Sequence, residues 1–285
     1  MRLATGLISG ERRTLAQRDA AGPAYDVTAV TGGDVRRAFG LSTEQLELPG
    51  RPEVDLADAI LLPPVPDPAK IVCVGLNFAT HAAEVVRDAG DHPTLFTRFA
   101  STFVGHGQPL LTPVESDTLD WEGEVVVVIG RGGRRIPAPA ALEHVAGYSA
   151  MGENSVRGFQ LHSAQATAGK NWDRSGSWGP WLVTADEVSE PRSLEVVTRL
   201  NGAEKQRGRL SDLVFDVPTV ISYISTFTEL SPGDVIATGT PSGIGHRETP
   251  PRYLRPGDVL EVELVDHLVL TNPVEADPDR PSTQL

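Results

Sequence analysis

A pair of carboxylates is the most informative candidate for chemistry in this sequence. Glu122 and Glu124 lie in the segment DWEGE (120–124), which runs directly into the apolar segment VVVVI. Because successive side chains of a strand point to opposite faces, these two carboxylates point the same way. Two like charges at the start of a buried strand need a metal cation, a basic side chain or a proton beside them. The pattern fits either a hard divalent cation bound through oxygen or a solvated acidic turn.

A third oxygen ligand would favour the metal site. Glu153, in the segment GYSAMGENS (147–155), is a candidate for it. Carboxylates without cysteine or clustered histidine favour Mg²⁺ or Mn²⁺ over Zn²⁺, and such an ion keeps waters that a bidentate substrate can displace.

Three other segments carry groups that could take part in catalysis. His81 and Glu84 are three residues apart and share a helix face, where they form either a general base with its orienting carboxylate or a surface ion pair. Lys170 lies in the loop AGKNWD and either binds a substrate carboxylate or is solvated. Thr240 lies in TGTPSGIG, which favours either close backbone approach to a small ligand, with the Thr240 hydroxyl donating, or a plain glycine turn.

Composition and missing motifs exclude several classes of protein. The net charge is −13 and no run of Lys or Arg occurs, so nucleic acid is not an expected partner. The sequence has no G-x-S-x-G nucleophile elbow, no G-x-G-x-x-G dinucleotide-binding motif and no H-E-x-x-H zinc-protease motif, so these three chemistries are not expected. The single cysteine, Cys73, lies in an apolar run and is expected to be buried. Without an apolar segment of about 18 residues or a signal core, we expect a cytoplasmic protein that does not bind membranes.

These groups must be positioned by a β-rich framework. The proline-dense segment LLPPVPDP (61–68) predicts a linker between a small N-terminal domain, residues 1–65, and a catalytic domain, residues 66–285. Apolar runs predict buried strands at 70–75 and 123–130, and Pro-Gly-Asp turns introduce strands within 230–239 and 254–264. Short helices are expected over 34–41, 77–88 and 217–227, and the segment 139–148 predicts a short helix that enters an extended piece. The mixture indicates an α+β fold whose strands form a mixed roll or distorted barrel.

Six motifs in order resemble the fumarylacetoacetate hydrolase family, and specifically a subgroup similar to 2-hydroxyhepta-2,4-diene-1,7-dioate isomerases and acylpyruvate hydrolases. They are GLNFATHAAE (75–84), PTLFTRFASTFVGHGQPL (93–110), LDWEGEVVVVIGRGGRRI (119–136), AGYSAMGENSVRGFQ (146–160), GKNWDRSGSWGPWLVTADEV (169–188) and LSPGDVIATGTPSGIG (230–245). The resemblance implies a catalytic domain of that family's β-roll type with a small N-terminal domain, and a homodimer.

The resemblance also assigns the site residues. It implies one Mg²⁺ or Mn²⁺ per chain, held by Glu122, Glu124 and Glu153. It implies that His81 and Glu84 lie on a lid helix and that Lys170 joins them in catalysis. The residues matching the family's substrate-binding groups are Arg157, Gln160 and Thr240.

Four residues depart from the pattern of the resembled family. Glu153 stands where most members have aspartate. Gly152 and Gly158 replace an asparagine and an aspartate, and Trp172 replaces a phenylalanine. The loss of an acid at position 158 predicts that Arg157 is less firmly oriented.

The resemblance implies a small oxo-acid substrate. Our first hypothesis is hydrolysis of a C–C bond in an acylpyruvate-like 1,3-dicarbonyl acid through a metal-bound enolate, with His81 and Glu84 activating a water. The alternatives are a decarboxylase or an isomerase or tautomerase of oxaloacetate-like or 2-hydroxy-dienedioate acids. An alternative of another class, motivated by Gly152 and Gly158, is a non-catalytic metal-dependent protein that binds oxo acids.

Overall fold

The computed structural model describes residues 1–84 and 90–279. A large sheet organises the chain, and twelve of its described strands hydrogen-bond side by side. In spatial order the main path is β4 (Glu53–Val54), β3 (Ala24–Asp26), β2 (Glu11–Gln17), β1 (Arg2–Ile8), β14 (Gly176–Thr184), β12 (Val145–Gly152), β11 (Gly123–Ile129), β17 (Val235–Ala237), β6 (Ile71–Gly75) and β7 (Thr94–Thr97). Off this path, β5 (Ile60–Leu61) pairs with β1, and β8 (Phe103–Val104) pairs with β14.

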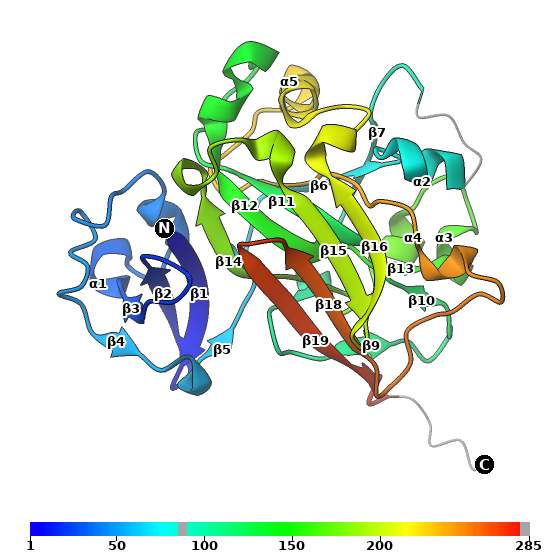
Figure 1. Cartoon of the computed structure of the whole chain (residues 1–285), viewed down its shortest axis with the longest axis horizontal. Helices are drawn as coiled ribbons and strands as arrows, with labels where there is room; N and C mark the ends of the chain where they lie inside the picture. The colour runs from blue at the N-terminus through cyan, green and yellow to red at the C-terminus, as the bar shows by residue number, and fades with distance from the viewer. Residues whose placement is uncertain (85–89, 280–285) are drawn as a thin grey trace.

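A second sheet packs against the middle of the first. Its order is β16 (Ala203–Arg209), β15 (Glu195–Leu200), β18 (Val259–Leu264), β19 (Leu268–Ala276) and β9 (Leu110–Thr112). A separate pair joins β10 (Leu119–Asp120) to β13 (Ser155–Val156). Figure 1 shows β15, β16, β18 and β19 in front of β11, β12 and β14. The prediction of a β-rich α+β fold with a small N-terminal β region is confirmed.

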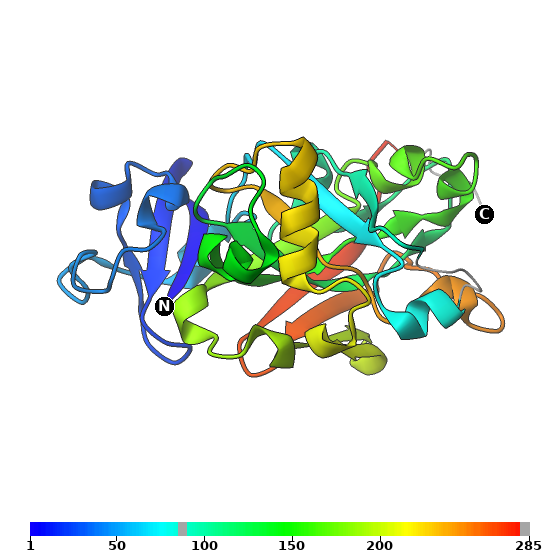
Figure 2. The same cartoon turned by 90° about the horizontal axis from the view of Figure 1, so that it is seen from above.

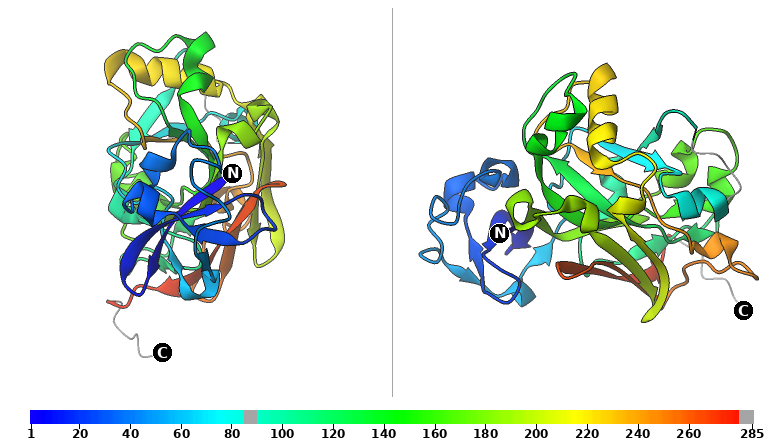
Figure 3. Two further views of the ribbon diagram at one scale, coloured as in Figure 1. Left: turned by 90° about the vertical axis from the view of Figure 1, so that its left-hand side faces the viewer. Right: turned by 45° about the horizontal axis from the view of Figure 1, so that its top comes forward.

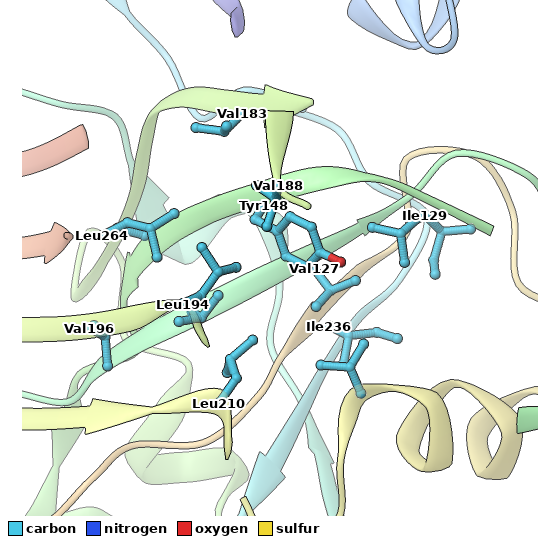
Figure 4. Packing of buried hydrophobic residues seen from close by; sticks show 14 of the residues in the cluster. Val127, Ile129, Tyr148, Val183, Val188, Leu194, Val196, Leu210, Ile236 and Leu264 are labelled. Atoms are coloured by element: carbon cyan, nitrogen blue, oxygen red, sulfur yellow. The ribbon is translucent and has the colours of Figure 1, made fainter. Parts of the chain in front are cut away.

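The strand β11 explains why the two sheets meet there. Its β-branched residues are all buried, and they alternate between two cores because strand side chains alternate between faces. Val125, Val127 and Ile129 belong to the same buried cluster as Val196 and Leu264 of the second sheet. Figure 4 shows Val127, Ile129, Val196 and Leu264 in this cluster. Val126 and Val128 join the core on the opposite face. A strand buried on both faces is rigid, so it fixes the groups at its ends.

Helices are short and few in the described part of the chain. They are α1 (Thr28–Thr31), α2 (Ala79–Glu84), α3 (Arg157–Gln160), α4 (Thr167–Lys170) and α5 (Val217–Phe227). The 3₁₀ helices are η1 (Val35–Ala38), η2 (Leu56–Asp58), η3 (Ala100–Thr102), η4 (Ala138–His144), η5 (Ala185–Glu187), η6 (Pro191–Ser193), η7 (Leu210–Asp212) and η8 (Gly245–Arg247). None of these helices, within residues 1–84 and 90–279, has the length and apolar character needed to cross a bilayer.

The longest helix, α5, begins where the sequence predicted it. Asp216 caps it by accepting from the backbone N–H of Thr219 at 3.0 Å, and a proline follows in the first turn. Its buried side chains recur at helical spacing and join the core between the sheets. From above, the helix crosses the middle of the molecule (Figure 2).

Two expected helices differ from the structure. The segment 34–41 contains only the 3₁₀ turn η1, because the extended residue Phe39 ends it. The segment 139–148 contains η4 and then the start of β12, so the expected passage from a helix into an extended piece is present and only the helix type, 3₁₀, differs from an α-helix. The helix expected over 77–88 is represented by α2, and its residues 85–88 lie outside the described residues.

The N-terminal strands extend the main sheet through the pairing of β1 with β14. Figure 1 places them at one end of the molecule and α2, α3 and α4 at the other. The right-hand view in Figure 3 shows the same separation. The division of the chain at residue 65 stays a prediction.

Candidate active site

A cavity of about 440 Å³ lies beside the end of β11. This volume is within the range of small-ligand sites. Eight of the nine residues predicted for the site line it, and the ninth, Glu84, contacts one of them. The eight are His81, Glu122, Glu124, Glu153, Arg157, Gln160, Lys170 and Thr240.

Strand register brings the three glutamates together. Gly123 pairs with Gly152 on the antiparallel strands β11 and β12, so the next pair outward is Glu122 and Glu153. The backbone N–H of Glu153 donates to the Glu122 carbonyl oxygen at 2.8 Å and extends the ladder by one step. Directly opposed residues share a face, as do Glu122 and Glu124 two positions apart. The ligand oxygens of all three lie within 4.8 Å of one another, and all three residues are buried.

Three cations, Lys170, Arg98 and Arg157, pair with Glu122 and Glu153. The Lys170 ammonium lies 3.1 Å from Glu122 Oε1, contacts Glu153 Oε2 and donates to the Glu153 carbonyl oxygen at 2.9 Å. The Arg98 guanidinium donates to Glu153 Oε1 at 3.2 Å. Burial alone would lower the pKa of Lys170, but Glu122 and Glu153 raise it, so the lysine stays charged.

Glu124 has no such partner. Among residues 1–84 and 90–279 it forms no ion pair, and its Oε2 accepts only from the backbone N–H of Gly239, at 2.7 Å. Burial raises the pKa of Glu124 well above its ordinary value, and the Glu153 carboxylate raises it further. By contrast, burial opposes the charge of Glu122, but Arg157 and Lys170 lower its pKa to about 2. The cluster therefore lacks positive charge at Glu124.

A divalent cation fits this arrangement. Three buried carboxylates, with no cysteine or histidine among the clustered ligand atoms of the described residues, form an oxygen donor set for a hard ion. Such an ion would supply the missing charge beside Glu124. The residues present thus fit a divalent metal at Glu122, Glu124 and Glu153.

His81 and Glu84 form a pair at one wall of the cavity. His81 Nδ1 lies 3.0 Å from Glu84 Oε2. Glu84 Oε1 accepts from the backbone N–H of Gly243 at 3.0 Å, so the carboxylate is fixed on both oxygens. The bonds to His81 and Gly243 lower the pKa of Glu84, although burial opposes them. The arrangement orients the imidazole and leaves its Nε2 as the nitrogen available to a ligand.

Arg157 is held more firmly than the sequence predicted. Its Nε donates to Asp120 Oδ2 at 2.8 Å and its Nη1 to Gln160 Oε1 at 2.7 Å, and Nη2 lies 2.9 Å from Glu122 Oε1. The glycine at position 158 does not loosen it, because Asp120 supplies the missing carboxylate from β10. Although Nη2 is close to Glu122, it is not aligned for a hydrogen bond to any described residue. Its hydrogens can therefore bind a ligand.

Thr240 is engaged within the protein. Its hydroxyl donates to the Gly123 carbonyl oxygen at 3.0 Å and accepts from Gln206 Nε2 at 2.8 Å. A hydroxyl has one hydrogen, so in this arrangement Thr240 lines the cavity without donating to a ligand. Its bonds tie the loop after β17 to the start of β11.

Two buried residues at the site were not singled out from the sequence. Arg98 bonds Glu153, and Asp120 bonds Arg157. The only local signal was a charged residue in an otherwise apolar context, within LFTRF for Arg98 and TLDW for Asp120. Their partners lie 55 and 37 residues away, so spacing could not reveal them.

Comparison with protein families confirms the resemblance seen in the motifs. The family model described as fumarylacetoacetate (FAA) hydrolase C-terminal matches residues 70–275. The mitochondrial oxaloacetate tautomerase fahd2 of Xenopus laevis is 38% identical over 216 residues, covering 75% of this chain and 68% of that protein. The oxaloacetate tautomerase YisK of Bacillus subtilis is 39% identical over 223 residues, covering 77% and 74%.

Solved structures extend the likeness over nearly the whole chain. A fumarylacetoacetate hydrolase from Exiguobacterium antarcticum is 34% identical, with a TM-score of 0.87 and coverage of 97% of this chain and 100% of that one. A maleylpyruvate hydrolase from Sphingobium, solved in complex with manganese(II) and pyruvate, is 28% identical, with a TM-score of 0.79 and coverage of 97% and 99%.

Proposed function

The chain belongs to the fumarylacetoacetate hydrolase family, and from this premise we propose that it catalyses keto–enol tautomerisation of a 2-oxo acid of the oxaloacetate class. The observation that carries this choice is the name shared by curated relatives at 38% and 39% identity, both of which are oxaloacetate tautomerases. These relatives support the tautomerase alternative better than our first hypothesis of hydrolysis. The non-catalytic alternative is not retained, because the family and the compared proteins are enzymes.

We propose that Glu122, Glu124 and Glu153 hold one Mg²⁺ or Mn²⁺ per chain. When bound, the ion would act as a Lewis acid that stabilises negative charge on a neighbouring oxygen of an oxo acid. The manganese complex of the Sphingobium hydrolase supports this assignment. The homodimer and the cytoplasmic location stay predictions.

The cationic and amide groups bind the substrate in this proposal. Arg157 Nη2 is buried and forms an ion pair with Glu122 Oε1 at 2.9 Å, but it makes no hydrogen bond within the described residues, so its hydrogens can bind a ligand. Gln160 accepts from Arg157 through Oε1, which leaves its amide N–H groups for a ligand. Lys170 is held by Glu122 and Glu153 at the same wall of the cavity and keeps its positive charge near developing negative charge.

His81 moves the proton. Tautomerisation takes a hydrogen from the carbon next to the oxo group, forms a carbon–carbon double bond with the released electron pair, and places a hydrogen on the oxo oxygen. His81 accepts the first proton at Nε2 and returns a proton to the oxygen, while Glu84 stabilises the intervening imidazolium. Substrate and product are isomers, so no co-reactant is consumed.

A C–C bond hydrolase is the second candidate. The observation that favours it is the likeness to a maleylpyruvate hydrolase over 97% of this chain. In that reaction His81 would take its proton from a water, and the water would attack the distal carbonyl of an acylpyruvate-like acid.

One experiment separates these reactions. The purified protein is loaded with Mn²⁺ and given the enol form of oxaloacetate, and loss of the enol ultraviolet absorbance is followed together with formation of pyruvate and CO₂. Faster enol loss without pyruvate is expected. Formation of pyruvate in step with enol loss identifies a decarboxylase instead. Cleavage of acylpyruvates together with no acceleration of enol loss identifies the hydrolase and overturns the proposal.

A further inference from the structure

The turn η8 carries two side chains that the proposed reaction does not use. His246 and Arg247 both line the cavity that contains the acidic triad. They follow the TGTPSGIG loop, which the sequence singled out for its glycines. Their position raises the question of what part of a substrate they contact.

Asp120 fixes this turn to Arg157. Its buried Oδ2 accepts from Arg157 Nε at 2.8 Å and from the His246 backbone N–H at 3.1 Å. Its Oδ1 accepts from the Gly245 backbone N–H at 2.8 Å. One carboxylate therefore sets the position of His246 relative to a residue proposed to bind substrate.

The turn is also closed against the protein behind it. A Cβ on Gly245 would lie 1.9 Å from the Arg252 carbonyl oxygen and 2.6 Å from the Trp121 ring. Only glycine fits such an approach, so the turn is built into the fold and is not a loose surface loop.

The His246 ring is oriented by a second contact. Its Nδ1 lies 2.8 Å from the Tyr253 hydroxyl, and the two rings are 6.2 Å apart between centroids. Burial lowers the pKa of His246, and the positive charge of Arg157 lowers it further, so the imidazole is neutral near pH 7. With the Tyr253 hydroxyl donating to Nδ1, the ring hydrogen lies on Nε2, which makes no hydrogen bond to a described residue.

The charges around the cavity indicate which ligand group this donor suits. Four buried carboxylates, Asp120, Glu122, Glu124 and Glu153, repel a second negative charge on a substrate. The chain as a whole carries −13. Near His246, the guanidinium groups of Arg157 and Arg247 provide positive potential: both lower the His246 pKa, and together they oppose the Asp120 carboxylate, which raises it. A distal carboxylate is therefore best accommodated there.

We propose that His246 is a specificity-determining residue that donates its Nε2 hydrogen to the distal carboxylate of a dicarboxylic 2-oxo acid, with Arg157 and Arg247 supplying positive charge around it. This inference rests on the proposed function for its substrate class. It assigns the selection of diacids over monoacids to the turn that follows the TGTPSGIG loop.

Binding of a diacid that cannot enolise tests the inference without requiring turnover. The probes are 3,3-dimethyloxaloacetate and its 4-methyl ester, which lacks the distal charge. Their dissociation constants for the Mn²⁺-loaded protein are measured by titration calorimetry for the wild type and for His246→Ala, His246→Gln, Arg247→Ala and Arg255→Ala. Arg255 is the control for loss of a surface arginine, since it is exposed, pairs with Asp117 and is absent from the cavity wall.

We expect His246→Ala to weaken diacid binding by about ten- to hundredfold, which is the range of a hydrogen bond to a charged group. Ester and Mn²⁺ binding should stay within about twofold, and His246→Gln should recover part of the loss because it keeps an N–H donor. Arg247→Ala should weaken diacid binding less, and Arg255→Ala should not. Equal losses for both probes, unchanged diacid binding in His246→Ala, or a wild type that does not prefer the diacid would each overturn the inference. If the wild type prefers the diacid through His246 but does not accelerate enol loss, the proposed tautomerase activity is refuted. The inference about His246 then stands.

Discussion

Glu122 and Glu153 face each other across the outward continuation of β11 and β12, joined by a 2.8 Å backbone hydrogen bond from Glu153 to Glu122. Cross-strand opposition places both carboxylates on one face, although β11, the turn after it, η4 and β12 separate them along the chain. A register shift of one residue would send Glu153 to the other face and dissolve the cluster. The proposed metal site therefore depends on strand pairing before it depends on any individual ligand.

Replacing Glu124 with glutamine should abolish tight metal binding and leave the fold intact. The Mn²⁺ dissociation constant is expected to rise by more than about 100-fold. Losing a residue that only hydrogen-bonds a metal ligand usually costs up to about 100-fold in affinity, and Glu124 is itself a proposed ligand. The metal-free variant should melt no lower than the metal-free wild type, because burial and Glu153 disfavour the charge that the substitution removes. Titration calorimetry and thermal unfolding measure both effects. The exposed Glu275→Gln serves as control, and Mn²⁺ binding to Glu124→Gln with wild-type affinity would refute the assignment.

Arg98 should be important for stability as well as for the site. Replacing it with methionine removes a buried partner from Glu153 and leaves hydrogen-bond acceptors at Asn154 and Ser175 unpaired. We expect the free energy of unfolding to fall by about 3–5 kcal/mol, the usual cost of breaking a buried ion pair. Arg255→Met, which removes an exposed pair with Asp117, should cost less than about 1 kcal/mol. Urea denaturation of the two variants compares them directly, and similar losses would contradict a special role for Arg98.

His81→Ala should reduce the catalytic rate by about 100- to 10,000-fold, the usual contribution of a positioned general acid–base group. Mn²⁺ affinity should not change, since His81 does not belong to the acidic cluster. Thr80→Ala, on an exposed position of the same helix, should retain wild-type activity. Steady-state rates on the enol of oxaloacetate give the comparison. A His81→Ala variant that is fully active would remove the imidazole from the mechanism.

The Glu84 carboxylate should make stability depend on pH on the acid side. Its bonds to His81 and Gly243 outweigh burial and lower its folded pKa below the unfolded value of 4.5. A carboxyl group with a depressed folded pKa binds fewer protons when folded, so its contribution is complete above pH 4.5 and is lost as the pH falls through the folded pKa. The difference in unfolding free energy between wild type and Glu84→Gln should therefore be constant from pH 7 to about pH 5 and shrink below that. Urea denaturation at several pH values measures this difference, and a gap that widens on acidification would show that the sign is wrong.

Structural features that depend on residues close together in the sequence could be predicted. The shared face of Glu122 and Glu124 follows from the two-residue period of a strand, and the start of α5 follows from Pro218 in its first turn. The buried strands at β6 and β11 also follow from their apolar runs. The shortened segments η1 and η4 were less predictable, because an extended residue ends each of them where the chain must join a strand or turn.

The sequence by itself determined the β-rich fold class, the family, and the residue types available for the site, because local periodicity and ordered motifs depend on near neighbours along the chain. Only the tertiary structure decided which charges meet. It paired Arg98 with Glu153, used Asp120 to hold both Arg157 and His246, and left Glu124 without a cation among the described residues. These relationships follow from strand register and loop packing between distant segments, and an ionisable group acquires its charge state from neighbours that its own segment does not specify.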